Sequence, residues 1–216
     1  MPIHTRYEVS NNAGQDICDI VNNEGFDFLL VGSGISMSDS PDDIAATRYR
    51  TSFYNRYFKR FKAPESWFYP GALLKDKTKM FIARSNCDVG VFINRNFVKA
   101  TNTLVVISSE EDLFLLDYTR TLLKATHGSV GTVAKMSTTT PGHDQILKEL
   151  WDFVSSTPQT QLLPDKDLTP GLFNSYNFML IGYNTWNDVS EHRKEALQKM
   201  PSTLILNKNK RSSSDN

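Results

Sequence analysis

The sequence holds only two cysteines among its 216 residues, Cys18 and Cys87. They form neither a CxxC pair nor a spacing typical of a zinc site, which argues against a disulfide framework and against a metal centre. We expect each to be a small buried residue, and the reducing setting that this implies is the cytoplasm.

Long apolar runs are absent as well. No segment approaches the roughly 18 consecutive apolar residues that cross a bilayer, and the opening stretch MPIHTRYEVS does not contain the apolar core of a signal peptide. Basic and acidic residues number 24 each, so the formal net charge is zero. This balance gives no reason to expect nucleic acid or an anionic membrane as a partner, and the composition is that of a soluble globular protein.

The four histidines are scattered through the chain at His4, His127, His143 and His192. No two of them have the spacing of metal ligands, and none stands beside a nucleophile motif. We therefore expect surface histidines, no metal site and no catalytic residues, so the chain is predicted not to be an enzyme.

Acidic residues gather at Glu110, Glu111 and Asp112, where a helix is predicted to begin. Negative charge at a helix start interacts favourably with the helix dipole, so capping is the favoured role. The acidic residues between 39 and 43 have the same character. A cation site is the alternative interpretation of either group.

Apolar runs of strand length alternate with amphipathic segments of helical period. Buried strands are predicted at 26–32, 87–97, 102–108, 129–137, 173–182 and 202–208, with a weaker one at 3–10. Helices are predicted at 11–25, ended by Gly25, and at 71–86, 110–128, 143–157 and 188–200, and the polar stretch before 173 is predicted to be a loop. Such alternation favours an α/β fold with a parallel sheet and right-handed crossovers.

The order strand, glycine, polar turn, helix, strand occurs twice, which indicates one and a half copies of a five-stranded unit. We expect a partial first unit over 1–99, interrupted by an insertion at 39–70, and a complete second unit over 100–210. Residues 211–216 are predicted to be a disordered tail. Because the first unit begins midway, we expect the chain to be a piece of a longer protein.

The insertion interleaves basic and aromatic residues between positions 48 and 69. Phe53, Tyr57 and Phe61 are spaced four apart, so a helix aligns them in one stripe. The stripe has three interpretations: packing on its own domain, a surface for a partner protein, or a contact with lipid or nucleic acid.

Glycines follow the first buried strand as Gly32, Ser33 and Gly34, and Gly71 opens the next predicted helix. A glycine turn at the carboxyl end of a parallel strand presents backbone N–H groups to a phosphate. A plain tight turn is the alternative, since no GxGxxG or Walker pattern is present. At the matching place in the second copy, Gly182 is followed by larger side chains that crowd a phosphate.

Three stretches carry a resemblance to a known family: FDFLLVGSGIS, FYPGALLKDKTKMFIARSNCDVGVFINRNF and TLVVISSEEDLFLLDYTRTLL. The chain resembles two universal-stress-protein-like units in tandem, of the adenine nucleotide alpha hydrolase-like type. More narrowly, it resembles the cytosolic C-terminal region of bacterial monovalent cation:proton antiporters of the type-2 family. The resemblance implies a helix-flanked parallel sheet in each unit, with units pairing across their last strands within a chain or in a homodimer.

The resemblance implies a non-catalytic regulatory domain on the cytoplasmic side of the inner membrane, with the transmembrane antiporter domain of the same longer chain as its partner. A free-standing nucleotide-binding universal stress protein is the alternative, and an enzyme of the related nucleotidyl-activating fold is a third. ATP or another adenine nucleotide is the candidate cofactor, and Gly32, Ser33, Gly34 and Gly71 are its candidate binding residues. The motif departs from the ATP-binding pattern, because the first two glycines are one residue apart and VVISSEED has no aspartate at its strand end.

Overall fold

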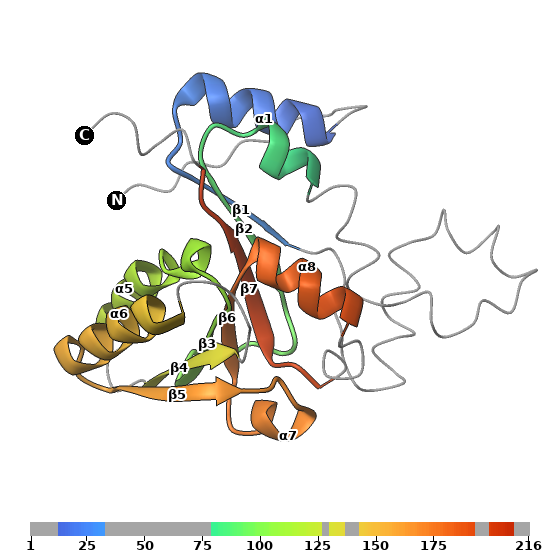
Figure 1. Ribbon diagram of the computed structural model, residues 1–216. Helices are drawn as coiled ribbons and strands as arrows, with labels where there is room; N and C mark the ends of the chain where they lie inside the picture. Colours follow the sequence, from blue (N-terminus) through green and yellow to red (C-terminus); the bar gives the residue numbers. More distant parts are fainter. Residues whose placement is uncertain (1–12, 33–78, 127–129, 137–142, 193–198, 210–216) are drawn as a thin grey trace, which may run out of the picture.

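The computed structural model describes residues 13–32, 79–126, 130–136, 143–192 and 199–209. The predicted strand at 3–10, the insertion and the tail lie outside these residues. The described part forms one seven-stranded sheet with the order β1-β2-β7-β6-β3-β4-β5 (Figure 1). The strands are β1 (Phe28–Gly32), β2 (Asp88–Ile93), β3 (Asn102–Ile107), β4 (Val130–Met136), β5 (Thr160–Lys166), β6 (Phe178–Gly182) and β7 (Ser202–Asn207).

All neighbouring strands run parallel except β2 and β7, which pair antiparallel with Val91 opposite Ile205. The prediction of an α/β fold with a mostly parallel sheet is therefore confirmed. Strands β3 to β7 form a parallel set in the order β5-β4-β3-β6-β7, and the parallel pair β1–β2 continues the sheet beyond β7 in the reverse direction.

Helices cover both faces of the sheet (Figure 1). They are α1 (Ala13–Glu24), a helical turn at 79–84, a 3₁₀ turn η2 (Glu110–Asp112), α5 (Leu115–Ala125), α6 (His143–Ser156), α7 (Pro170–Phe173) and α8 (Tyr183–His192). Because both faces are covered, the central strands are mostly apolar, and all five residues of β6 are buried. No helix within the described ranges is long and apolar enough to cross a bilayer.

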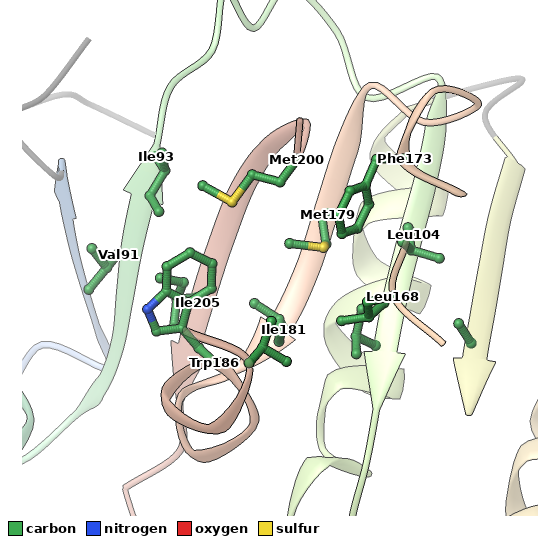
Figure 2. Packing of buried hydrophobic residues seen from close by; sticks show 13 residues of the cluster. Val91, Ile93, Leu104, Leu168, Phe173, Met179, Ile181, Trp186, Met200 and Ile205 are labelled. Carbon is green, nitrogen blue, oxygen red and sulfur yellow. The ribbon is translucent and has the colours of Figure 1, made fainter. Parts of the chain in front are cut away.

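One face of the sheet packs against α8 and α7 (Figure 2). Trp186 of α8 is 1 % exposed and lies with Ile181 of β6 and Ile205 of β7 in one buried cluster. The opposite face packs against α5 and α6 through a second cluster that includes Leu115 and Leu150. Deleting a buried side chain as large as Trp186 costs about 3–5 kcal/mol. The two clusters therefore contribute strongly to stability, and they hold α8 and α5 against the strands.

The β1–β2 end of the sheet packs against α1 and the 79–84 turn. Cys18 and Cys87 are both free and buried there, as predicted. Helix α1 ends at Gly25, whose φ of 68° lies in the left-handed region that glycine adopts without strain. The predicted end of this helix is confirmed.

Several sequence-based boundaries were wrong. The strand predicted at 87–97 ends at Ile93, and the helix predicted at 110–128 is divided into η2 and α5. The stretch predicted to be a polar loop contains β5, and Pro164 is tolerated there because β5 is the last strand on that side of the described sheet and needs only one set of backbone partners. Helix α8 begins at Tyr183, directly after β6, and not at 188, because Thr185, Trp186 and Val189 bury one face of the first turns. The strand predicted from 173 begins at Phe178, because residues 170–173 form α7.

Candidate functional site

The carboxyl ends of β3 and β6 lie side by side at the point where the direction of strand addition reverses. From β3 the chain adds β4 and β5 on one side, and it then returns to place β6 on the other side of β3. In open parallel sheets this switch point is where ligands bind, because two neighbouring loops diverge there and leave a crevice. It is therefore the first place to examine for a site.

A buried carboxylate occupies this switch point. The Oδ2 atom of Asp112 accepts hydrogen bonds from the Ser108 backbone N–H at 2.9 Å, the Ser108 hydroxyl at 3.0 Å and the Ser109 backbone N–H at 3.2 Å. The Thr185 hydroxyl donates to the same oxygen at 2.6 Å and also contacts the Ser108 hydroxyl. Asp112 is only 2 % exposed, so its charge is stabilised by these donors and not by water.

The second oxygen of Asp112 lies against the last residue of β6. A Cβ atom built on Gly182 would stand 1.9 Å from Asp112 Oδ1, so only glycine leaves room for the carboxylate. Beside this contact, the amide of Asn184 donates to Glu111 at 2.7 Å. Side chains from η2 and from the first turn of α8 thus meet over the ends of both strands.

The position of the Asp112 carboxylate determines whether the described part of the switch point has room for a phosphate. In a phosphate-binding sheet, the phosphate lies over a glycine at the start of the helix, where backbone N–H groups face it. Here the carboxylate of Asp112 lies over Gly182, at the start of α8. A phosphate placed there would meet both the volume and the negative charge of Asp112, so the site is closed by the protein's own anion.

The sequence analysis recovered only part of this network. Capping was predicted for the acidic cluster at 110–112, and the bond from the Ser109 N–H to Asp112 is of that kind. The bond from Thr185 to Asp112, 73 residues away, was missed, because it depends on β3 and β6 being neighbours. The strand end itself carries no aspartate, yet the η2 turn brings the Asp112 carboxylate back to it.

Of the four residues predicted to bind a nucleotide, only Gly32 belongs to the described residues. It is the exposed last residue of β1, and among the described residues, which end at this position and resume at 79, nothing lies within 4 Å of a Cβ atom built on it. Gly34, Gly71 and Ser33 lie outside the described residues, so their assembly into a pocket stays a prediction. No described side chain lies against Gly32, whereas the Asp112 carboxylate lies against Gly182.

A second polar network joins α5 to β2. The Tyr118 hydroxyl donates to Asp88 Oδ2 at 2.8 Å, and the Asn209 backbone N–H donates to Asp88 Oδ1 at 2.7 Å. Burial, together with this bond and the charge of Asp88, raises the pKa of the Tyr118 hydroxyl far above its ordinary value. Burial likewise raises the pKa of the neighbouring Cys87 thiol, so neither group is activated as a nucleophile.

Metal-type clusters of three or more His, Cys, Asp or Glu side chains do not occur among the described residues. The ring of His192 lies 3.2 Å from the Asp188 carboxylate on the exposed side of α8. Nothing in the described part of the chain pairs this histidine with a nucleophile.

Comparison with solved structures identifies the fold. A universal stress protein from Archaeoglobus fulgidus DSM 4304 matches with a TM-score of 0.50 and 10 % identity over 91 % of this chain and 66 % of that one. A putative universal stress protein from Pseudomonas aeruginosa UCBPP-PA14 matches with a TM-score of 0.48 and 11 % identity over 91 % and 68 %. A universal stress protein in complex with cAMP matches with a TM-score of 0.37 and 14 % identity over 50 % and 97 %.

The fold of this chain is therefore that of the universal stress proteins. The chain spans about two thirds of the length of the Archaeoglobus protein. No protein-family model matches the sequence, and no curated protein matches it significantly.

Proposed function

We propose that this chain is a non-catalytic regulatory module, which acts by docking and not by turning over a nucleotide. The observation that supports this proposal most strongly is the position of the Asp112 carboxylate, which lies directly against Gly182. A carboxylate held by four hydrogen bonds at the switch point stabilises the closed form of the place where such a sheet would otherwise bind phosphate.

The module consists, in this proposal, of a partial unit over 1–99 and a complete unit over 100–210. The antiparallel pairing of β2 with β7 supports this division, because it joins two parallel sets of strands through the last strand of each. The bond from Tyr118 to Asp88 crosses the same boundary, since α5 belongs to the second unit and β2 to the first. Two units that share one sheet move as a body, which suits a docking element.

The proposed partner is the transmembrane domain of a monovalent cation:proton antiporter in the same longer chain. The support for this partner is the likeness of the three sequence stretches quoted above. Regulation requires that the module bind one state of the transporter more tightly than the other. The basic and aromatic segment at 48–69 is the proposed contact surface.

An immunoblot of fractionated source cells tests this placement. An antibody raised against the 216-residue chain is expected to detect a membrane-bound polypeptide far larger than 24.5 kDa. Detection of a soluble polypeptide of the size of this chain would contradict the antiporter assignment. The purified chain is also expected to release no phosphate from ATP.

A free-standing nucleotide-binding protein is the second candidate, and the open surface at Gly32 favours it. Differential scanning fluorimetry with ATP, AMP and cAMP separates the two candidates, since a ligand at 100 times its Kd stabilises by about 2.7 kcal/mol. Gly32→Val is the informative variant, because a Cβ atom at this position meets none of the described residues, while the valine side chain would crowd a phosphate at the glycine turn. Stabilisation by a nucleotide that Gly32→Val removes would favour this second candidate.

A further inference from the structure

A cavity of about 580 Å³ lies at the end of the sheet opposite to the Asp112 network. It is formed where β2 ends and where β7, β6 and β3 begin, because β2 runs antiparallel to β7. Six of its lining residues carry the argument, namely Arg95, Phe97, Lys99, Tyr176, Asn177 and Lys199. Its volume lies in the range of small-molecule sites, about 300–1,000 Å³.

The charge around this cavity has one sign. Arg95, Lys99 and Lys199 line it, and no Asp or Glu does so among the described residues. The chain as a whole is neutral, so this concentration of positive charge is a local feature. A hollow lined by charges of one sign focuses the field and raises the local concentration of ions of the opposite sign.

The backbone that carries two of these cations is fixed by hydrogen bonds. The Arg95 backbone N–H donates to the Ser202 hydroxyl at 2.8 Å, and its guanidinium Nη1 donates to the Met200 carbonyl at 3.1 Å. The Asn177 amide donates to the Lys99 carbonyl at 2.8 Å. The wall therefore holds its shape before a ligand arrives, which lowers the entropic cost of binding.

An aromatic surface lies beside the cations. Phe97 is 38 % exposed, and its ring is seated on Phe178 with centroids 5.2 Å apart. Tyr176 lines the same cavity and is half-buried. Aromatic side chains of this kind offer an apolar surface to a planar ring, and the lysines that line the same cavity offer charge-assisted hydrogen bonds to a negative group.

We propose that this cavity binds a small organic anion that carries a phosphate group on a planar ring. Lys99 and Lys199, both exposed at the rim, hold the phosphate, and Phe97 and Tyr176 contact the ring. The site lies at the amino ends of β3 and β6, away from the carboxyl ends where Asp112 closes the switch point. The proposal does not depend on the regulatory function proposed above.

Phenyl phosphate is the probe that tests the site, because it is among the smallest molecules with both groups. Titrated at millimolar concentration into the ¹⁵N-labelled full chain, it is expected to shift the backbone amides of 95–99, 176–177, 199–200 and 202. Inorganic phosphate and benzyl alcohol, which each carry one of the two groups, are expected to bind more weakly at the same amides. Added salt is expected to weaken phenyl phosphate binding, since exposed charges are screened.

The double variant Lys99→Ala/Lys199→Ala is expected to weaken phenyl phosphate binding by about tenfold or more, because two charge-assisted contacts are lost. The matched control is Lys124→Ala/Lys148→Ala, which removes the same charge from exposed positions on α5 and α6 and is expected to bind as the native chain does. The absence of shifts at these amides would overturn the proposal. Equal weakening by both double variants, or equal affinity for inorganic phosphate, would also overturn it.

Discussion

The carboxylate of Asp112 occupies the space that a side chain at position 182 would need, with Oδ1 only 1.9 Å from a Cβ atom built on Gly182. The absence of a side chain at position 182 and the burial of the Asp112 carboxylate depend on each other. Gly182 has no side chain because Asp112 lies there, and Asp112 is buried because Ser108, Ser109 and Thr185 supply its donors. The relationship closes the switch point of the sheet and gives several testable consequences.

The substitution Gly182→Ala forces either the carboxylate or the start of α8 to move. We expect a loss of about 1–3 kcal/mol in the free energy of unfolding, measured by urea denaturation, as for other overpacked sites. The control is Gly171→Ala, where the nearest atom to a new Cβ is Thr169 Oγ1 at 3.9 Å. If both variants have the stability of the native chain, Asp112 is not seated over Gly182.

The substitution Asp112→Asn keeps the shape of the side chain and removes its charge. An amide in place of Oδ2 offers N–H groups to donors, so we expect a loss of about 1–3 kcal/mol. Asp152→Asn, on the exposed side of α6, is the matched control and should be neutral. In a double-mutant cycle with Thr185→Val, we expect a coupling of at least about 0.5 kcal/mol, and strict additivity would contradict the bond between them.

Removal of the Tyr118 hydroxyl tests the contact between α5 and β2. We expect Tyr118→Phe to lose about 1–2 kcal/mol at neutral pH, because Asp88 then loses a donor. Folding raises the pKa of this hydroxyl above its ordinary value of 10.0, so its contribution is complete below that pH and is lost as the pH rises toward the folded-state pKa.

Stability measured against pH in the alkaline range separates this effect from general alkaline unfolding. The native chain should lose stability above about pH 10 more steeply than Tyr118→Phe does, since only the native chain has this group to ionise. Parallel curves for the two proteins would refute the part-buried Tyr118–Asp88 bond.

The side chain of Asn177 holds the segment that leads from β2 into β3. Its amide donates to the Lys99 carbonyl and the Thr101 hydroxyl, and its oxygen accepts from the N–H groups of Thr101 and Asn102. We expect Asn177→Ala to cost about 1–2 kcal/mol, because four hydrogen bonds are lost while water replaces part of them at this exposed position. The control is Asn174→Ala, at another exposed asparagine of the same segment. Equal stability of the two variants would show that the Asn177 side chain does not hold the segment between β2 and β3.

The sequence predicted the fold well where strands are buried on both faces. The runs at 102–108 and 202–208 have apolar centres, LVVI and LIL, and the structure places strands there. Strand β5 was missed because its position at the end of the described sheet lets it carry Gln161, Pro164 and Asp165 with few apolar residues. Local composition thus predicts central strands better than edge strands.

The candidate site was harder to predict, because it depends on which strands are neighbours. The sequence indicated capping at Asp112, which is present, whereas the crowding it predicted came from the residues after Gly182 and not from Asp112, which lies against Gly182 itself. That the two meet follows only from the parallel pairing of β3 with β6, which no local pattern encodes. The cavity at Arg95 was missed for the same reason, since it requires β2 to end beside the start of β7.

The central claim is that the protein's own carboxylate closes the switch point between β3 and β6. An ATP titration of the ¹⁵N-labelled chain tests it most directly, through the backbone amides of 108–112 and 182–185. We expect these amides to stay unshifted at saturating ATP, whether or not amides near Gly32 respond. A saturable shift at Ser108, Asp112 and Gly182 would show that a nucleotide displaces the Asp112 network and would contradict the account.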